Sequence, residues 1–214
     1  MKTPYLLFDF DGTIADSIHP LFEMLNRMAP SLNIGPVTWE EFDRLRDLSP
    51  RQILKELKIP LYMMPKLIRM VLEEYRDIIS HLQPCEGVLE LLSNLKERNI
   101  PHALLSSNAD QNLAAFLAKY QIDSFAWAEG TEGILNKNRY LGKQIRKHKL
   151  QQYDLYYIGD EIRDIEAAIH NRIKSIAVSW GLHSHNHLQK HKPDYLVDKP
   201  LEILEIMNQT NKHE

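Results

Sequence analysis

The sequence predicts an α/β fold organised around a parallel β-sheet. Short apolar runs rich in β-forming residues alternate with helical patterns along most of the 214 residues, which is the pattern of βαβ units. Residues 16–84 interrupt this alternation, because they contain several helical stretches and no convincing strand. The length of the chain corresponds to one large domain that carries an insertion.

Five apolar runs are the predicted strands of the sheet, and a shorter sixth run is added near the end of the chain. The strands are Tyr5–Phe10, His102–Ser107, Ser124–Ala128, Asp154–Asp160, Lys174–Trp180 and the short Asp194–Asp198. Crossover helices are predicted between them at Gly87–Arg98, Gln111–Tyr120, Asn138–His148 and Ile162–Asn171, with a terminal helix from Leu201.

The inserted residues are predicted to form four helices separated by breaks that contain proline or glycine. These helices are Ser17–Met28, Trp39–Asp47, Pro50–Leu57 and Pro65–His81. The insertion leaves after the first strand and returns before the second, where open α/β sheets bind their ligands. We therefore expect a core domain formed by residues 1–15 and 85–214, and a helical cap, or lid, formed by residues 16–84.

The composition excludes several classes of protein. The 26 basic against 29 acidic residues give a charge of -3, which argues against a nucleic-acid binder driven by bulk charge. A single cysteine, Cys85, excludes an intramolecular disulfide and a multi-cysteine zinc site within one chain. No apolar run approaches the roughly 18 residues of a membrane span, and the first ten residues reach acidic residues too soon for a signal peptide. We expect a cytoplasmic protein without a membrane partner.

The first strand ends in the stretch Asp9-Phe10-Asp11-Gly12-Thr13. Side chains of a strand alternate with period two, so Asp9 and Asp11 are expected on the same side. Paired carboxylates at the carboxyl edge of a parallel sheet have three interpretations. They are a hard-cation site, a nucleophile with an acid–base group, or unrelated surface residues. An EF-hand is excluded, because glycine takes the fourth position of the loop instead of the sixth.

The second strand ends in Ser107 and Asn108, and Asp110 follows at the predicted start of a helix. A hydroxyl group and backbone N–H groups at a helix N-terminus form an anion site. The alternative is that Ser107 or Asn108 only caps the helix. Their position at the end of a strand favours the anion site.

The fourth strand leads into Asp160, Glu161 and Asp164. Asp160 and Asp164 are four residues apart, so in a helical turn they repel each other unless a cation compensates. Capping of a helix by acidic residues is the alternative. If the first and fourth strands are neighbours, these residues meet Asp9 and Asp11 at one edge and supply the oxygen ligands that Mg²⁺ requires.

Together these motifs resemble the haloacid-dehalogenase-like (HAD) superfamily of phosphotransferases over nearly the whole chain. DFDGTIADS resembles its first motif, Ser107-Asn108 its second, a lysine before the fourth strand its third, and GDEIRD its fourth. The resemblance implies a Rossmann-like sheet of order 5-4-1-2-3 sandwiched by helices, with a C1-type cap. The stretches YYIGDEIRDIEAA, SWG and PDYLVDKPLEIL resemble the phosphoglycolate-phosphatase-like branch.

The resemblance also implies roles for the acidic residues. Asp9 would be the nucleophile that attacks phosphorus, and Asp11 would protonate the leaving oxygen and then deprotonate the attacking water. Mg²⁺ would be held by the Asp9 carboxylate, the backbone carbonyl of Asp11 and the Asp160 carboxylate. Asp164 would lie behind these ligands or reach the metal through water.

Two lysines, Lys137 and Lys143, precede the fourth strand and are candidates for the third motif. We choose Lys137, because it comes just after the third-strand loop, whereas Lys143 falls inside a predicted helix. Its charge would offset the negative charge of the carboxylate and the phosphate. The other residues expected around the phosphoryl group are Gly12, Thr13, Ser107 and Asn108.

The resemblance implies that the segment Leu45–Arg51 contributes to substrate binding, because family members with this cap type often reach the substrate there. Arg46 and Arg51 would bind a substrate carboxylate there, and the alternative is that they face solvent. The histidines His183, His185, His187 and His191 follow Trp180-Gly181. A second metal site at these histidines is conceivable but not expected, because no acidic or cysteine partner is identified nearby in the sequence.

We therefore predict a Mg²⁺-dependent phosphatase of a small phosphorylated metabolite, either a monomer or a homodimer, with no nucleic-acid partner. An acid two residues after the nucleophile favours phosphate-ester chemistry over dehalogenation, which has no alkoxide to protonate. The alternatives are a phosphosugar mutase of the same superfamily and a non-catalytic module that binds a phosphorylated ligand or a partner protein.

Overall fold

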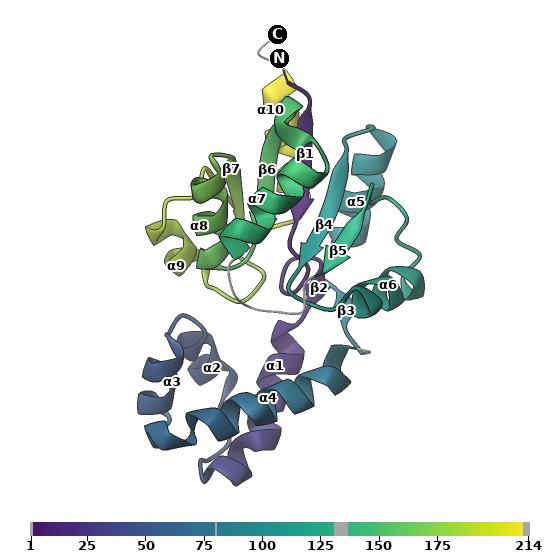
Figure 1. Ribbon diagram of the computed structural model, residues 1–214. Helices are drawn as coiled ribbons and strands as arrows, with labels where there is room; N and C mark the ends of the chain where they lie inside the picture. The colour runs from purple at the N-terminus through teal and green to yellow at the C-terminus, as the bar shows by residue number, and fades with distance from the viewer. Residues whose placement is uncertain (1, 80, 131–136, 212–214) are drawn as a thin grey trace. The chain divides into compact units, whose positions relative to one another are not determined.

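The computed structural model describes residues 2–79, 81–130 and 137–211 (Figure 1). The chain forms two compact units, Met1–Asp16 with Pro84–Glu214 and Ser17–Gln83. We call the first the α/β unit and the second the helical unit. Each boundary lies one residue from the position expected from the sequence.

The α/β unit contains a six-stranded parallel sheet in the order β5-β4-β1-β6-β7-β8. Its strands are β1 Pro4–Phe8, β4 His102–Ser106, β5 Ala128–Gly130, β6 Asp154–Gly159, β7 Lys174–Val178 and β8 Tyr195–Val197. Counted along the chain, the first five of these have the predicted order 5-4-1-2-3, and β8 extends the sheet beside β7. The predicted α/β fold with a parallel sheet is confirmed.

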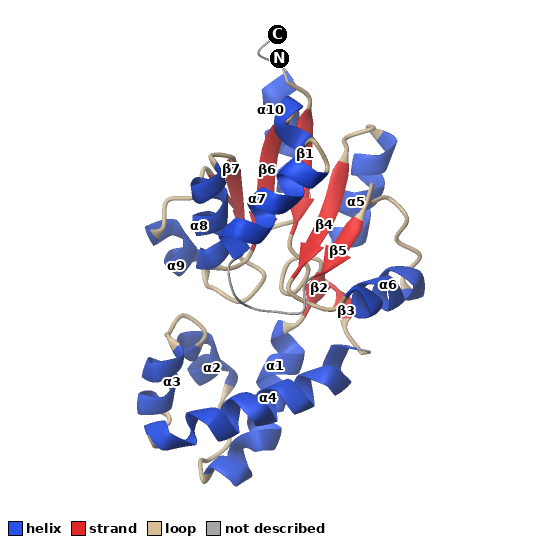
Figure 2. Cartoon of the chain, viewed as in Figure 1, coloured by secondary structure: helices blue, strands red, loops and turns tan. Residues whose placement is uncertain are grey.

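Helices cover both faces of this sheet (Figure 2). They are α5 Val88–Glu97, α6 Asp110–Lys119, α7 Lys137–Lys147, α8 Ile162–Asn171, α9 His185–Lys190 and α10 Glu202–Asn211, with a 3-10 turn at Leu150–Gln152. Leu141 of α7 and Ala167 of α8 share one core cluster with Leu7 of β1. Leu6 and Phe8, which alternate with Leu7, are equally buried, so both faces of the strand are covered.

The strand boundaries differ from the predicted ones by at most two residues, except at the start of β5, where the difference is four. β1 ends at Phe8 instead of Phe10, because the chain turns at once: Ile14 N and Ala15 N both donate to Phe10 O. β5 begins at Ala128 instead of Ser124, although Ala126 N already donates to His102 O. The apolar character of a run therefore located each strand but did not fix where its ladder of hydrogen bonds begins or ends.

The helical unit contains α1 Ile18–Met28, α2 Trp39–Leu45, α3 Pro50–Glu56 and α4 Met64–Ile79, with 3-10 turns at Ala29–Leu32 and Leu61–Met63. Each α-helix falls within one predicted segment, except that α4 begins one residue early, at Met64. Ser80, within the last predicted segment, lies outside the described residues. Thr38 and Ser49 begin α2 and α3 with capping boxes, which satisfy N–H groups in the first turn of each helix.

Two very short strands, β2 Ala15–Asp16 and β3 Gln83–Pro84, pair with each other where the chain leaves and re-enters the α/β unit. The sequence does not predict these strands, because two residues are too few to show an alternating pattern. Within the described part of the chain, no helix is both long and apolar enough to cross a membrane.

Candidate active site

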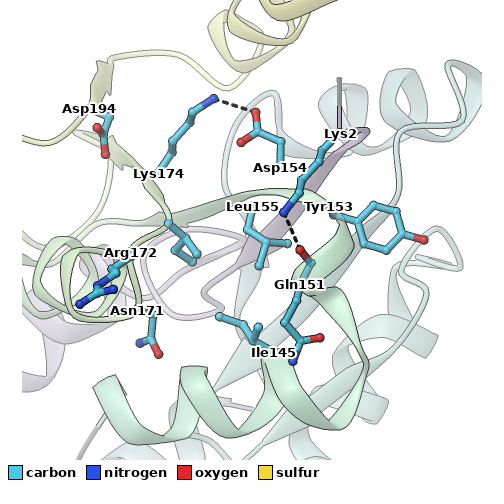
Figure 3. Close-up of a pocket in the computed structure, with 11 residues that line it drawn as sticks. Lys2, Ile145, Gln151, Tyr153, Asp154, Leu155, Asn171, Arg172, Lys174 and Asp194 are labelled. Carbon is cyan, nitrogen blue, oxygen red and sulfur yellow. Dashed lines mark hydrogen bonds and ion pairs between the residues drawn. The ribbon is translucent and has the colours of Figure 1, made fainter.

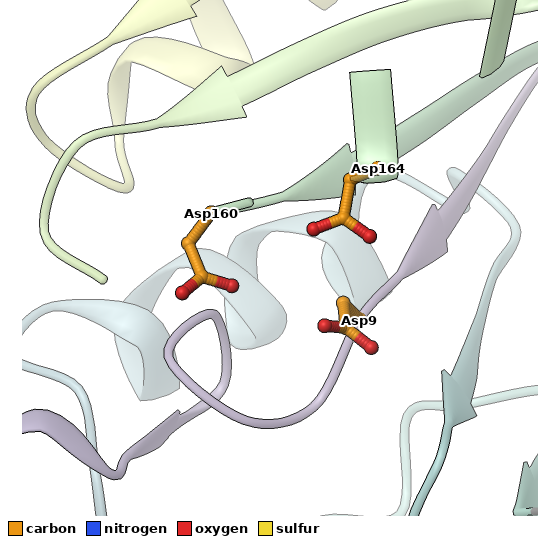
Figure 4. A group of neighbouring side chains, drawn as sticks. All are labelled: Asp9, Asp160 and Asp164. Carbon is orange, nitrogen blue, oxygen red and sulfur yellow. The ribbon is translucent and has the colours of Figure 1, made fainter. Parts of the chain in front are cut away.

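Three buried carboxylates meet at the carboxyl edge of the sheet (Figure 4). Asp9 follows β1, Asp160 follows β6, and Asp164 lies in the first turn of α8. β1 and β6 are neighbours, and Asp9 N donates to Ile158 O over 2.8 Å, which brings the two strand ends together. Ligand oxygens of the three side chains lie within 4.8 Å of one another. The edge is also where the strand order reverses, the usual ligand site of open α/β sheets.

Lys137 lies against this cluster. It is the first residue of α7, and its Nζ is 2.9 Å from Asp9 Oδ2 and in contact with Asp164 Oδ1. Its side chain is 13% exposed, so both ion pairs are largely shielded from water. Lys143, the other lysine considered from the sequence, is exposed on the same helix. The structure therefore brings Lys137, and not Lys143, to the predicted acidic residues.

Burial is the main influence on the pKa values of the acidic residues in this site, and the neighbouring charges add to it or oppose it. Burial raises the pKa of Asp160 well above its ordinary value, and the charges of Glu161 and Asp164 raise it further. Burial likewise raises the pKa of Asp9, and of Asp164 to about 7, while Lys137 opposes both shifts. Burial would lower the pKa of Lys137, but Asp164 and Asp9 raise it well above its usual range.

The first turn of α8 fixes Asp164. Glu161 is the N-cap residue, and its backbone N–H donates to Asp164 Oδ2 over 3.0 Å as part of a capping box. Glu161 itself forms an ion pair with Arg163, which reduces its contribution to the negative charge of the cluster. A Cβ at Gly159 would lie 2.3 Å from Asp164 Cγ, so this close approach requires glycine. The predicted capping role of the acidic residues and the predicted cluster thus both occur.

Asp11 occupies a different environment from Asp9. It is half-buried in the turn after β1 and forms an isolated bridge with Ala15. Because β1 ends at Phe8, the two-residue alternation that we used to place Asp9 and Asp11 on one side of a strand does not apply. Among the described residues, the group of carboxylates close enough to share a cation contains Asp9, Asp160 and Asp164 but not the Asp11 side chain.

Gly12 and Thr13 form the rest of this turn and contact Asp160. Thr13 Oγ1 donates to Asp160 Oδ1 over 3.1 Å. Gly12 has φ +71°, and a Cβ there would lie 2.1 Å from Asp160 Oδ2. A side chain at this position would therefore both strain the backbone and displace the carboxylate.

Ser107 and Asn108 follow β4, the neighbour of β1 on the other side. Asn108 Oδ1 accepts hydrogen bonds from Ala109 N, at 2.9 Å, and from Asn112 Nδ2, at 2.7 Å. The N-cap residue of α6 is Ala109, without a side-chain hydrogen bond, so the alternative that Ser107 or Asn108 caps this helix is wrong. Asp110 instead accepts from Gly130 N and connects α6 to β5.

The remaining predicted residues are the two cap arginines and the four histidines. Arg46 and Arg51 belong to the helical unit, where Arg46 pairs with Asp43 over 2.7 Å and Arg51 is exposed on α3. The His183, His187 and His191 rings follow one another at centroid distances of 5.1 and 5.6 Å. His185 pairs with Asp198, an acidic residue 13 positions further along the chain. Across the described residues, these histidines form no group with metal-binding geometry.

A separate pocket lies at the opposite edge of the sheet, where β6 and β7 begin (Figure 3). Two of its basic residues have partners in the structure: Lys174 Nζ is 2.7 Å from Asp154 Oδ2, and Lys2 Nζ donates to Gln151 O. These two contacts join residues at the beginnings of the strands, and we assign no reaction to this pocket.

Comparison with known proteins identifies the family of the chain. Residues 6–178 match the model of the haloacid dehalogenase-like hydrolase family, so the chain belongs to that family, as predicted. A phosphoglycolate phosphatase from Synechococcus elongatus is 32% identical over 205 residues, covering 95% of this chain and 97% of the relative. The pyrophosphatase PpaX from Bacillus cereus is 22% identical over 228 residues, covering 99% and 100%.

A solved structure shows the same fold. The haloacid dehalogenase-like family hydrolase from Streptococcus pneumoniae superimposes with a TM-score of 0.78 at 19% identity, covering 95% of this chain and 98% of that one. At this identity the likeness establishes the fold alone.

Proposed function

We propose that this protein is a Mg²⁺-dependent phosphatase that hydrolyses a small phosphomonoester through an aspartyl-phosphate intermediate. The observation that carries the proposal is the buried cluster of Asp9, Asp160 and Asp164, with Lys137 in contact with two of its members. Three carboxylates beside one lysine leave negative charge in a shielded site, which a divalent cation would offset. The family of the chain and the activities of its relatives support the same class of reaction.

The chemistry of the donor set fits Mg²⁺, which takes oxygen ligands and commonly binds one or two carboxylates together with a substrate phosphate. Asp9 and Asp160 would supply carboxylate oxygens and Asp11 its backbone carbonyl. Asp164 would not bind the cation directly: it would either orient the direct ligands or contact the cation through a water molecule. When bound, the cation would supply electrostatic stabilisation of the transferring phosphoryl group.

Asp9 and Asp11 would perform the two covalent steps. A carboxylate oxygen of Asp9 attacks phosphorus, the bond to the leaving oxygen breaks, and Asp11 donates a proton to that oxygen. Asp11 then removes a proton from water, the resulting hydroxide attacks the phosphorus of the aspartyl phosphate, and the bond to Asp9 breaks to release inorganic phosphate. Lys137 would keep Asp9 ionised for the attack and offset charge on the phosphoryl oxygens.

The loop after β4 would hold the phosphoryl oxygens. Ser107 offers a hydroxyl group, and the region around Asn108 offers backbone and side-chain N–H groups. The hydrogen bonds from Ala109 and Asn112 fix Asn108 Oδ1, so the amide group of this side chain has a defined orientation. Donors that are ordered before the substrate binds need no reorganisation in the transition state. Gly12 and Thr13 would line the same site from the turn after β1.

Phosphoglycolate and pyrophosphate are the substrates that the names of the relatives suggest. Phosphoglycolate carries a carboxylate as well as a phosphate, and Arg46 and Arg51 are our candidates for binding that carboxylate. Arg46→Gln and Arg51→Gln should then raise KM for phosphoglycolate without changing KM for pyrophosphate.

The proposal is tested by measuring phosphate release from phosphoglycolate, sugar phosphates, nucleotides and pyrophosphate, each with Mg²⁺ and with a chelator. We expect release that requires Mg²⁺ and that is strongest for one class of substrate. Release without a divalent cation would contradict the metal requirement.

Analysis of the products separates the alternatives. A mutase would convert one sugar phosphate into another while phosphate stays in the organic pool, and a binding module would retain its ligand unchanged. Either result would overturn the phosphatase proposal.

A further inference from the structure

The loop that follows β7, residues 180–183, wraps around Asp160. Gly181 is buried, and a Cβ there would lie 2.2 Å from Asp160 Cβ and 2.4 Å from Gly12 O. Only a residue without a side chain can therefore pass between the loop after β6 and the turn after β1. Leu182 N donates to Asp160 Oδ2 over 2.6 Å, and His183 N donates to Asp160 O over 3.2 Å.

Trp180 connects this loop to the turn that follows β1. Its indole Nε1 donates to Thr13 O over 3.1 Å, although the two residues are 167 positions apart in the sequence. The same Thr13 donates its hydroxyl group to the other carboxylate oxygen of Asp160. The indole of Trp180 therefore anchors Thr13, and the hydroxyl group of Thr13 in turn orients the Asp160 carboxylate.

Both oxygens of the Asp160 carboxylate thus accept a hydrogen bond from a fixed donor, Thr13 Oγ1 on one side and Leu182 N on the other. Donors on both sides set the plane of the carboxylate and favour its charged form, against the burial that disfavours it. Partners of this kind orient metal ligands, and their loss commonly costs about 10- to 100-fold in metal affinity or activity.

We propose that Trp180 is a positioning residue for the metal site: its indole N–H anchors Thr13 and so fixes the orientation of Asp160. The proposal rests on the proposed function only in taking Asp160 as a metal ligand. Trp180 itself need not touch the substrate or the cation. Its effect should therefore appear in the Mg²⁺ requirement and not in the affinity for the substrate.

The test is Trp180→Phe, which keeps an aromatic ring but removes the N–H donor. The matched control is Trp127→Phe in the same unit, which removes an indole that bonds to Tyr5 and stacks on His148. Far-UV circular dichroism and melting without metal establish that both variants fold. Binding of Mg²⁺ alone is then measured from the rise in melting temperature with Mg²⁺ concentration, so the readout does not depend on turnover.

We expect Trp180→Phe to raise the Mg²⁺ concentration at half-effect by about tenfold, within the range usual for partners of metal ligands. The same factor should appear in the Mg²⁺ dependence of phosphate release, with KM for the substrate unchanged. Trp127→Phe should match the wild type in both. Gly181→Ala, which would displace Asp160 directly, should weaken Mg²⁺ binding still more.

Equal Mg²⁺ dependence in Trp180→Phe and the wild type would overturn the positioning role while leaving the phosphatase proposal standing. A rise in KM with unchanged Mg²⁺ binding would overturn it too, because Trp180 would then act on the substrate. If the wild type binds Mg²⁺ but hydrolyses no phosphomonoester, the proposed function fails, and the metal-binding comparison still decides the role of Trp180. A wild type that binds no Mg²⁺ would contradict both proposals.

Discussion

Lys137→Met should both destabilise the fold and remove most of the activity. The lysine Nζ pairs with Asp9 at 2.9 Å and with Asp164, and these side chains are 13%, 6% and 2% exposed. Removing one partner of a buried ion pair costs about 3 to 5 kcal/mol, because the remaining charge is left without compensation. Methionine is similar in length, so the loss reports mainly on charge and not on a cavity.

The assays are urea unfolding, which gives the free energy of unfolding, and thermal unfolding, both in a chelating buffer so that no cation replaces the missing charge. At roughly 2 to 4 °C for each kcal/mol in a chain of this size, the melting temperature should fall by about 6 to 20 °C. The turnover number should fall by about 10² to 10³, the usual effect of removing one group that stabilises transition-state charge.

Lys143→Met is the matched control, because Lys143 is exposed on the same helix, α7. It should change the free energy of unfolding by less than about 0.5 kcal/mol and leave turnover at the level of the wild type. If Lys143→Met is the severe variant and Lys137→Met the mild one, the assignment of the lysine is refuted.

Two further predictions concern a reacting group and a buried histidine. Asp11→Asn should lower kcat by about 10² to 10⁴, because the amide cannot transfer the proton, and unchanged steady-state kinetics in a folded variant would remove Asp11 from the mechanism. The free energy of unfolding should decrease as the pH falls below about 6.5, because burial lowers the pKa of His102 from its ordinary value of 6.5. The hydrogen bond from His102 Nδ1–H to the carbonyl of Ile100 opposes this shift but does not outweigh it. The unfolded chain therefore binds this proton at a higher pH than the folded chain, and stability is fully present only above the unfolded pKa. His102→Gln should reduce that dependence in urea titrations between pH 7.5 and 5.5, as checked against the wild-type slope, and an identical slope would show that other groups cause it.

The sequence was sufficient to place residues that lie directly at the ends of strands. Asp9 and Asp160 each follow a β-strand, so their meeting depends only on β1 and β6 being neighbours, which the order of the sheet supplies. Lys137 could be chosen over Lys143 because it stands where a loop becomes a helix and can face the edge of the sheet.

Features that depend on how turns and loops fold in three dimensions could not be predicted from the sequence pattern. The alternation of strand residues could not place Asp11, because β1 ends at Phe8 and Gly12 adopts a positive φ that turns the chain. The charge of Asp11 still contributes to the raised pKa of Asp9. The bond from Trp180 to Thr13 joins loops after β7 and β1, two strands that are not adjacent, and no local pattern reports such a contact. The short helix α9 was missed for a simpler reason: Ser184 caps it, but the six residues that follow contain a single buried apolar side chain, Leu188.

Trapping of a phosphorylated protein tests the central claim most directly. Wild-type protein with Mg²⁺ and its preferred substrate is quenched in acid within the first turnover, and its peptides are analysed by mass spectrometry. We predict a phosphoryl group on Asp9 that is absent when a chelator is present and absent in Asp9→Asn. The control is Asp123→Asn, which replaces an exposed aspartate and should leave the phosphorylation of Asp9 unchanged. Turnover by Asp9→Asn at the rate of the wild type, or a phosphoryl group on a different residue, would contradict the account.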